Sequence, residues 1–126
     1  MSVLLVALGG AAGAVVRYLL GLIPVKEFTS FPLITLLINA LGAFAIGIIA
    51  AAAQKYNLNE NLVLFIKVGV CGGFTTFSTF SLEAYNLFLS GKTITALCYI
   101  MLSVVLCVCA VLLSTNVIGG YSIGGK

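Results

Sequence analysis

Long apolar runs separated by short polar segments dominate this chain. The runs lie at about residues 3–23, 33–53, 62–89 and 93–114. Each is as long as the roughly 20 residues that an α-helix needs to cross the hydrocarbon core of a bilayer. The pattern predicts an all-α membrane protein with four transmembrane helices, in a single domain at residues 1–115 that is followed by a flexible tail at residues 116–126.

Composition agrees with this interpretation. Of the 126 residues, 62% are hydrophobic and only 7% are charged, against roughly 25% charged in a typical soluble domain. The net charge of +3 comes from isolated residues and not from a basic cluster, so we expect no nucleic acid partner. The first run is preceded by no Lys or Arg, so we expect it to stay in the membrane and not to act as a cleaved signal peptide.

One stretch inside the third run is too polar for a plain lipid-facing helix. Residues 69–81 include three glycines and five hydroxyl side chains. Glycine tolerates unusual backbone angles, and Ser or Thr can bond the backbone groups that a break leaves free. We therefore predict that the third helix unwinds in mid-membrane near Gly72 and Gly73 and resumes around Thr76. Such a break exposes carbonyl oxygens and amide hydrogens that can meet an ion.

Arg17 follows a Gly9-x-x-x-Gly13 pattern, which gives a smooth helix face for close packing. An arginine at the centre of a span costs about 2.5–3.5 kcal/mol. Two interpretations remain open. Arg17 either extends to the membrane surface as an anchor, or it gives an aqueous vestibule or a partner interface a positive potential that attracts anions.

Asn39 is an amide at membrane depth in the second run, on one helix face with Ala43 and Gly47. It could link two helices by hydrogen bonds. Alternatively, its amide nitrogen could offer two hydrogens to an anion in a pore. The sequence leaves both interpretations open.

Two lines of side chains follow the predicted break. Phe77 and Phe80 share one helix face, and Thr75, Thr79 and Glu83 follow one another at four-residue steps. Such a pair of rings usually packs in a core. Beside a break, however, the ring edges carry partial positive charge and can face an anion.

The fourth run carries a weakly polar stripe of Tyr99, Ser103 and Cys107 at four-residue spacing. This stripe could flank a conduction path, or its serine could bond back to its own helix. All four cysteines fall inside predicted spans, and we expect small, buried packing residues and neither disulfides nor a zinc site. They are Cys71, Cys98, Cys107 and Cys109.

Basic residues are divided equally between the two ends of the predicted helices. Lysine and arginine asymmetry in short loops sets membrane orientation, and here there is none. We therefore predict a dual-topology antiparallel homodimer, which supplies by association the inverted repeat that many transporters carry within one chain. The two sets are Lys55, Lys67 and Lys126 against Arg17, Lys26 and Lys92.

These motifs resemble those of the Fluc or CrcB small fluoride channels over nearly the whole chain. The resemblance rests on residues 9–18, on Asn39 with Gly42 and Gly47, and above all on the highly specific residues 72–81. It implies passive, fluoride-selective export of cytoplasmic fluoride that gives fluoride resistance. It also implies a multi-pass protein of the cell's inner (plasma) membrane, with two pores in each antiparallel dimer.

The resemblance assigns roles to individual residues. A structural Na⁺ ion would lie at the dimer centre on the backbone carbonyls of Gly72 and Thr75 from both subunits, and Arg17 would belong to a vestibule. Cys107 departs from the family pattern, which often has serine there, and a thiol is a poorer hydrogen-bonding group. The implied fluoride-pore residues are Asn39, Phe77, Phe80, Thr79, Ser81, Glu83, Tyr99 and Ser103.

Two other functions fit parts of the pattern. A proton-coupled small multidrug exporter resembles this chain in size, span number and dual topology, but it relies on a carboxylate in its first span. Here that span has Arg17, and the only membrane carboxylate is Glu83. A structural subunit without transport explains the small residues but not the predicted break. With no phosphate-binding loop or catalytic constellation, we expect no enzyme.

Overall fold

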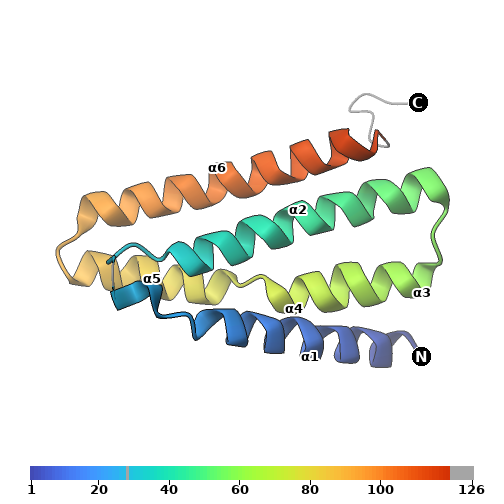
Figure 1. The fold of residues 1–126 in the computed structure, drawn as a ribbon, viewed down its shortest axis with the longest axis horizontal. Helices are drawn as coiled ribbons and strands as arrows, with labels where there is room; N and C mark the ends of the chain where they lie inside the picture. The colour runs from blue at the N-terminus through green and yellow to red at the C-terminus, as the bar shows by residue number, and fades with distance from the viewer. Residues whose placement is uncertain (28, 120–126) are drawn as a thin grey trace.

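The computed structural model describes residues 1–27 and 29–119, and in this part of the chain it is all-helical (Figure 1). Its long helical segments are long and apolar enough to cross a membrane, which confirms the predicted all-α membrane protein with four spans. The segments are Ser2–Gly21, Leu33–Tyr56, Glu60–Leu89 and Thr93–Ile118.

The first, second and fourth spans are continuous helices. They are α1 (Ser2–Gly21), α2 (Leu33–Tyr56) and α6 (Thr93–Ile118), and a short 3₁₀ turn, η1 (Pro24–Glu27), follows α1. Helix α6 runs further than the predicted end at residue 114 and so includes the start of the predicted tail. The rest of that tail, from residue 120, lies outside the described residues.

The third span is built from four pieces. In order they are α3 (Glu60–Val63), the π-helical η2 (Leu64–Cys71), α4 (Gly72–Phe74) and α5 (Phe77–Leu89). Between α4 and α5 the backbone is extended, with φ −77° and ψ 155° at Thr75 and φ −148° and ψ 113° at Thr76. This two-residue segment, called the Thr75–Thr76 link below, separates the two halves of the span.

The link does not lie where the glycines suggested. Gly72 has helical angles, φ −63° and ψ −38°, and belongs with Gly73 to α4. The restart predicted around Thr76 matches α5, which begins at Phe77 with Thr76 as its N-cap, but the unwinding expected near the two glycines lies after them. The extended residues are the two threonines that follow.

Gly69 and Gly73 of the third span serve close packing, whereas a Cβ at Gly72 would meet nothing within 4 Å. A Cβ added at Gly73 would lie 2.4 Å from the carbonyl oxygen of Gly10, and one at Gly13 would lie 2.2 Å from that of Val70. No side chain fits at either position, so α1 lies directly on the backbone of η2 and α4. The close-packing face predicted at Gly9 and Gly13 is confirmed, because both glycines are buried in this contact.

The spans lie side by side, with α6 against α2 and the third span against α1 (Figure 1). The start of α1 and the end of α6 lie at the same end of the molecule. The buried cluster joins α2, α5 and α6 near the other end, and many large apolar side chains elsewhere are exposed in the single chain. Its members are Leu36, Phe80, Ala84, Leu87, Ala96 and Tyr99.

Candidate ion-conduction site

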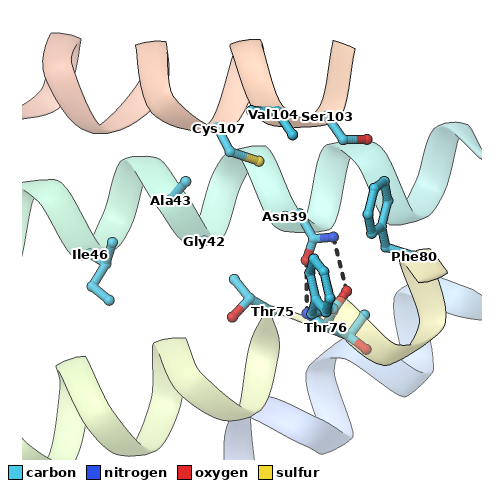
Figure 2. Close-up of a pocket in the computed structure, with 11 residues that line it drawn as sticks. Asn39, Gly42, Ala43, Ile46, Thr75, Thr76, Phe80, Ser103, Val104 and Cys107 are labelled. Carbon is cyan, nitrogen blue, oxygen red and sulfur yellow. Dashed lines mark hydrogen bonds between the residues drawn. The ribbon is translucent and has the colours of Figure 1, made fainter. Parts of the chain in front are cut away.

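A groove of about 360 Å³ lies beside the Thr75–Thr76 link. Side chains from α2, the link, the start of α5 and α6 surround it, as Figure 2 shows for most of them. Of the predicted site residues, it brings together one amide, two rings and one hydroxyl side chain, together with Thr75 and Cys107. The lining residues are Asn39, Gly42, Ala43, Ile46, Thr75, Thr76, Phe77, Phe80, Ser103, Val104 and Cys107.

Asn39 makes two hydrogen bonds to the backbone of the link, one as donor and one as acceptor. Its Nδ2 donates to the carbonyl oxygen of Thr76 at 3.1 Å, and the Thr76 amide donates to its Oδ1 at 2.8 Å (dashed in Figure 2). The helix-linking interpretation of Asn39 is therefore confirmed, with a backbone as its partner. One amide hydrogen of Nδ2 is not needed for this pair, because an amide nitrogen carries two. Asn39 can thus hold the link and still offer a donor to the groove.

Thr76 starts the second half of the span. Its Oγ1 accepts a hydrogen bond from the Thr79 amide at 3.2 Å and donates to Thr79 Oγ1 at 3.0 Å. A threonine oxygen that accepts from an amide three residues on is a standard helix N-cap. This capping role of Thr76 was not predicted, although a Thr that precedes a helical run is the signal for it.

The link leaves two carbonyl oxygens without their helical donors. In a continuous helix the Gly72 carbonyl would accept from the Thr76 amide, which here donates to Asn39. The Thr75 carbonyl would accept from the Thr79 amide, which here donates to Thr76 Oγ1. The carbonyl of Gly73, between them, accepts from Arg17 Nε at 3.2 Å.

The two predicted rings meet but differ in their surroundings. The centroids of Phe77 and Phe80 are 5.5 Å apart. Phe80 is 9% exposed and lies 5.2 Å from the Tyr99 ring, centroid to centroid, whereas Phe77 is 79% exposed in the single chain. Phe80 is thus both a core residue and a groove residue. Phe77 has a free face.

Glu83 joins three helices through hydrogen bonds. Thr35 Oγ1 donates to its Oε1 at 3.0 Å, and the Tyr99 hydroxyl donates to its Oε2 at 2.9 Å. We call these three residues the carboxylate node. Thr35 was not among the predicted site residues, although it lies one helical turn before Asn39 on the same face of α2.

A second hollow, of about 310 Å³, lies on the α1 side of the node. Arg17 and Thr79 line this hollow and not the groove, and Thr35, Thr76 and Glu83 also reach it. The predicted residues are therefore divided between two adjoining spaces. The Asn39-bound link and α5 separate them.

The remaining candidates have contrasting environments. Ser103 is buried, and within the described residues its Oγ has no hydrogen-bond partner. Its predicted alternative, a bond back to its own helix, is therefore wrong. Ser81 is exposed and donates to the Phe77 carbonyl of its own helix at 2.8 Å. It is not brought to the groove in the single chain.

Comparison with known proteins places these features in a family. The chain matches, over residues 4–124, the model of the family described as CrcB-like protein, Camphor Resistance (CrcB). A protein of Azobacteroides pseudotrichonymphae named "Fluoride-specific ion channel FluC" is 42% identical over 114 residues, which are 89% of this chain and 91% of that protein.

Two further proteins of the same name are similar over most of their length. The one from Methylobacterium radiotolerans is 38% identical over 125 residues, which are 97% of this chain and 87% of the relative. The one from Ruminiclostridium cellulolyticum is 44% identical over 115 residues, which are 90% and 88% of the two chains. From the match to the family model and these three relatives, we conclude that the chain belongs to the CrcB family, as its glycine, asparagine and phenylalanine motifs predicted.

Proposed function

We propose that this protein is a fluoride-selective channel of the inner (plasma) membrane, through which cytoplasmic fluoride leaves the cell passively. Three relatives named as fluoride-specific ion channels support this proposal. The observation that carries it is the groove beside the link. There Asn39, Phe80 and the hydroxyl of Ser103, which has no hydrogen-bond partner among the described residues, converge.

This groove suits a small, strongly hydrated anion. Fluoride can enter only if donors replace its hydration, and it can leave only if no single site binds it too tightly. The Asn39 amide, the Ser103 hydroxyl and ring edges are weak, neutral donors of this kind. The lining residues found in the described part of the chain include no Lys or Arg. Arg17 lies in the adjoining hollow, where its charge can attract anions without holding them in the groove.

The proposed path continues from the groove toward the carboxylate node. Phe80 lies between the two, because its ring lines the groove and packs on Tyr99. Tyr99, Thr79 and Glu83 then extend the line of polar side chains into the adjoining hollow. Conduction along this line needs neither ATP nor a catalytic group, as expected for an ion channel that is not an enzyme.

The proposed functional unit is an antiparallel dual-topology homodimer with two pores. The equal division of basic residues between the two ends supports insertion in both orientations. The exposure of Phe77 also favours a second subunit. This ring is 79% exposed in the single chain, so it can form one wall of an ion path only when another molecule covers its free face. Each groove would be closed by the partner.

A structural Na⁺ ion at the dimer centre belongs to the same proposal. The carbonyls of Gly72 and Thr75 fit it, because both have lost their helical donors and carbonyl dipoles can replace the hydration of a small cation. Gly72 is exposed, and a Cβ added there would meet nothing within 4 Å, so a second copy can approach. When bound, the ion would supply positive charge to the unwound backbone.

The main test is ion efflux from liposomes. Purified protein is reconstituted into vesicles loaded with potassium fluoride or potassium chloride, and valinomycin carries the compensating potassium. We expect fluoride to leave within the assay while chloride stays inside, as followed with ion-selective electrodes. Equal leakage of both anions would reject the proposed function.

Phe77→Ile tests the lining in the same assay. We expect fluoride efflux to fall about tenfold or more, because losing ring-edge contacts worth about 1.4 kcal/mol in the conducting state corresponds to that factor. Phe88→Ile is the matched control, since Phe88 is another exposed ring of α5 that lines none of the spaces described here. Similar loss in both variants would mean that helix packing, and not the lining, is being measured.

A further inference from the structure

We infer that Cys107 makes the groove a binding site for small thiophilic metal ions, whose attachment blocks the passage of anions. The blocking part of this inference rests on the proposed fluoride channel. The metal site itself does not, because it follows from the side chains that face the groove.

Cys107 is the groove's thiol. It is half-buried on α6, and Figure 2 shows its sulfur pointing into the space between α6 and α2. Cys71 is buried in η2, whereas Cys98 and Cys109 are exposed in the single chain, contrary to the expected burial. None of these three is among the groove-lining residues of the described chain. A reagent that reaches the groove therefore meets a single sulfur.

Ser103 provides the second, independent observation. It lies one helical turn before Cys107, so the two side chains share one face of α6. It is only 6% exposed, lines the same groove, and its Oγ has no partner among the described residues. A buried hydroxyl without a partner is costly unless a ligand or water completes it. The groove side of α6 thus presents a thiol beside an oxygen that requires a partner.

The pair defines the ligand class. Cysteine sulfur selects soft metal ions, while hard ions such as Mg²⁺ prefer carboxylate, carbonyl and water oxygens. Access also matters, because Ile46, Val104 and the phenylalanine rings make most of the wall apolar. Small neutral species should therefore enter more readily than bulky charged reagents. Mercuric chloride is a suitable probe.

The reaction with this probe is a simple substitution. The S–H bond of Cys107 and one Hg–Cl bond break, and an S–Hg bond forms. The proton passes to water and the chloride ion leaves, so neither sulfur nor mercury changes oxidation state. The remaining Hg–Cl unit then occupies the groove beside Ser103, where the proposed path runs.

The experiment uses the full chain in fluoride-loaded liposomes with and without mercuric chloride. Each variant is normalised to its own untreated rate. We expect treated wild-type protein to lose more than about tenfold in fluoride efflux, because an occupied path cannot conduct, and excess dithiothreitol to restore it. Cys107→Ser should keep its own rate after treatment, whereas Cys98→Ser and Cys109→Ser should be blocked like wild type.

A direct binding measurement separates this inference from the proposed function. In a Cys71→Ser, Cys98→Ser, Cys109→Ser triple variant, Cys107 is the sole thiol. We expect intact-protein mass spectrometry to find one mercury per chain. If untreated wild-type protein conducts no fluoride, the channel proposal fails, but the adduct still reports on the site.

Three results would overturn the inference. They are an unblocked wild-type channel, equal block of the Cys107→Ser variant, and no adduct on the sole-cysteine variant. Should Cys107→Ser fail to conduct before treatment, Cys107→Ala replaces it in the efflux comparison. The mass measurement decides the site in either case.

Discussion

The two halves of the third span make their contacts in opposite ways. Before the Thr75–Thr76 link, η2 and α4 meet α1 backbone to backbone, with glycine on both sides at Gly9 and Gly69. After the link, α5 meets α2 and α6 through side-chain hydrogen bonds at Glu83. In the described part of the chain, no residue of η2 or α4 lines the groove or the second hollow, whereas residues of α5 line both.

This difference shows two ways in which helices select their packing partners in an apolar environment. Small residues let helices approach closely, and dispersion then holds them by shape alone. Hydrogen bonds inside a membrane average only about 0.6 kcal/mol, but they choose particular partners. The first half should therefore respond to added volume, and the second to lost polarity. The proposed ion site lies at the link, where the two kinds of contact meet.

Added volume in the close-packed half should have the largest effect. Gly13→Ala places a Cβ 2.2 Å from the Val70 carbonyl oxygen, so α1 must move away. Overpacking of this kind costs about 1–3 kcal/mol, and more where backbone must shift. We expect a lower thermal midpoint and a lower yield of monodisperse protein in detergent.

The matched control for Gly13→Ala is Gly10→Ala in the same helix. A Cβ at Gly10 meets nothing within 4 Å, so stability should stay near that of wild type. Equal destabilisation of both variants would show that the contact with η2 is not what limits volume in α1.

Asn39→Asp tests the junction itself. The aspartate keeps an acceptor for the Thr76 amide but loses the donor to the Thr76 carbonyl, and it adds negative charge to the groove. An unsatisfied carbonyl costs about 1–3 kcal/mol, and the charge repels fluoride. We expect fluoride efflux to be lost in the liposome assay.

Asn61→Asp is the corresponding control, because Asn61 is exposed in the first turn of α3, where an added carboxylate is tolerated. Efflux by this variant should match wild type. Normal conduction by Asn39→Asp would remove Asn39 from the proposed path.

The carboxylate node should give an intermediate effect. Tyr99→Phe removes one donor to Glu83 and keeps the ring, so we expect a loss of about 1 kcal/mol in unfolding free energy. Glu83→Gln replaces one carboxylate oxygen by an amide nitrogen, so the side chain can no longer accept from both Thr35 and Tyr99 through separate oxygens. The two changes should therefore be less than additive in a double-mutant cycle. Tyr85→Phe, an exposed tyrosine of α5, is the control. Strict additivity would show that this bond contributes nothing.

Ser81→Ala should have the smallest effect. Its hydroxyl bonds the Phe77 carbonyl of its own helix and is exposed, and such surface changes are usually within about 0.5 kcal/mol. We expect unchanged stability and fluoride efflux close to wild type. A strong loss of efflux without a loss of stability would place the outer face of α5 on the ion path.

Much of the fold and the membership of the site followed from local patterns. Four apolar runs predicted four spans because a bilayer demands roughly 20 apolar residues per helix. Four-residue spacing placed Tyr99, Ser103 and Cys107 on one face of α6, and the structure brings all three to the groove or the node. The Gly9-x-x-x-Gly13 pattern predicted a close contact, although not its partner.

The position of the break could not be predicted in the same way. Gly72 and Gly73 have the residue type that tolerates unwinding, yet both belong to α4. The lack of a side chain at Gly73 serves its close contact with Gly10 of α1, whereas a Cβ at Gly72 would meet nothing within 4 Å. The extended residues are Thr75 and Thr76, since an amide from another helix binds the Thr76 backbone.

By itself, the sequence determined the class of protein, the number and approximate positions of its spans, and many of the polar residues that gather near one another. These depend on hydrophobicity and helical period, which act over a few residues. Only the tertiary structure decided that Asn39 holds the backbone of a residue 37 positions away and that Thr35 reaches Glu83 across 48. Such pairs form only when whole helices pack against one another. Their partners therefore depend on the arrangement of all the helices, which local sequence patterns do not specify.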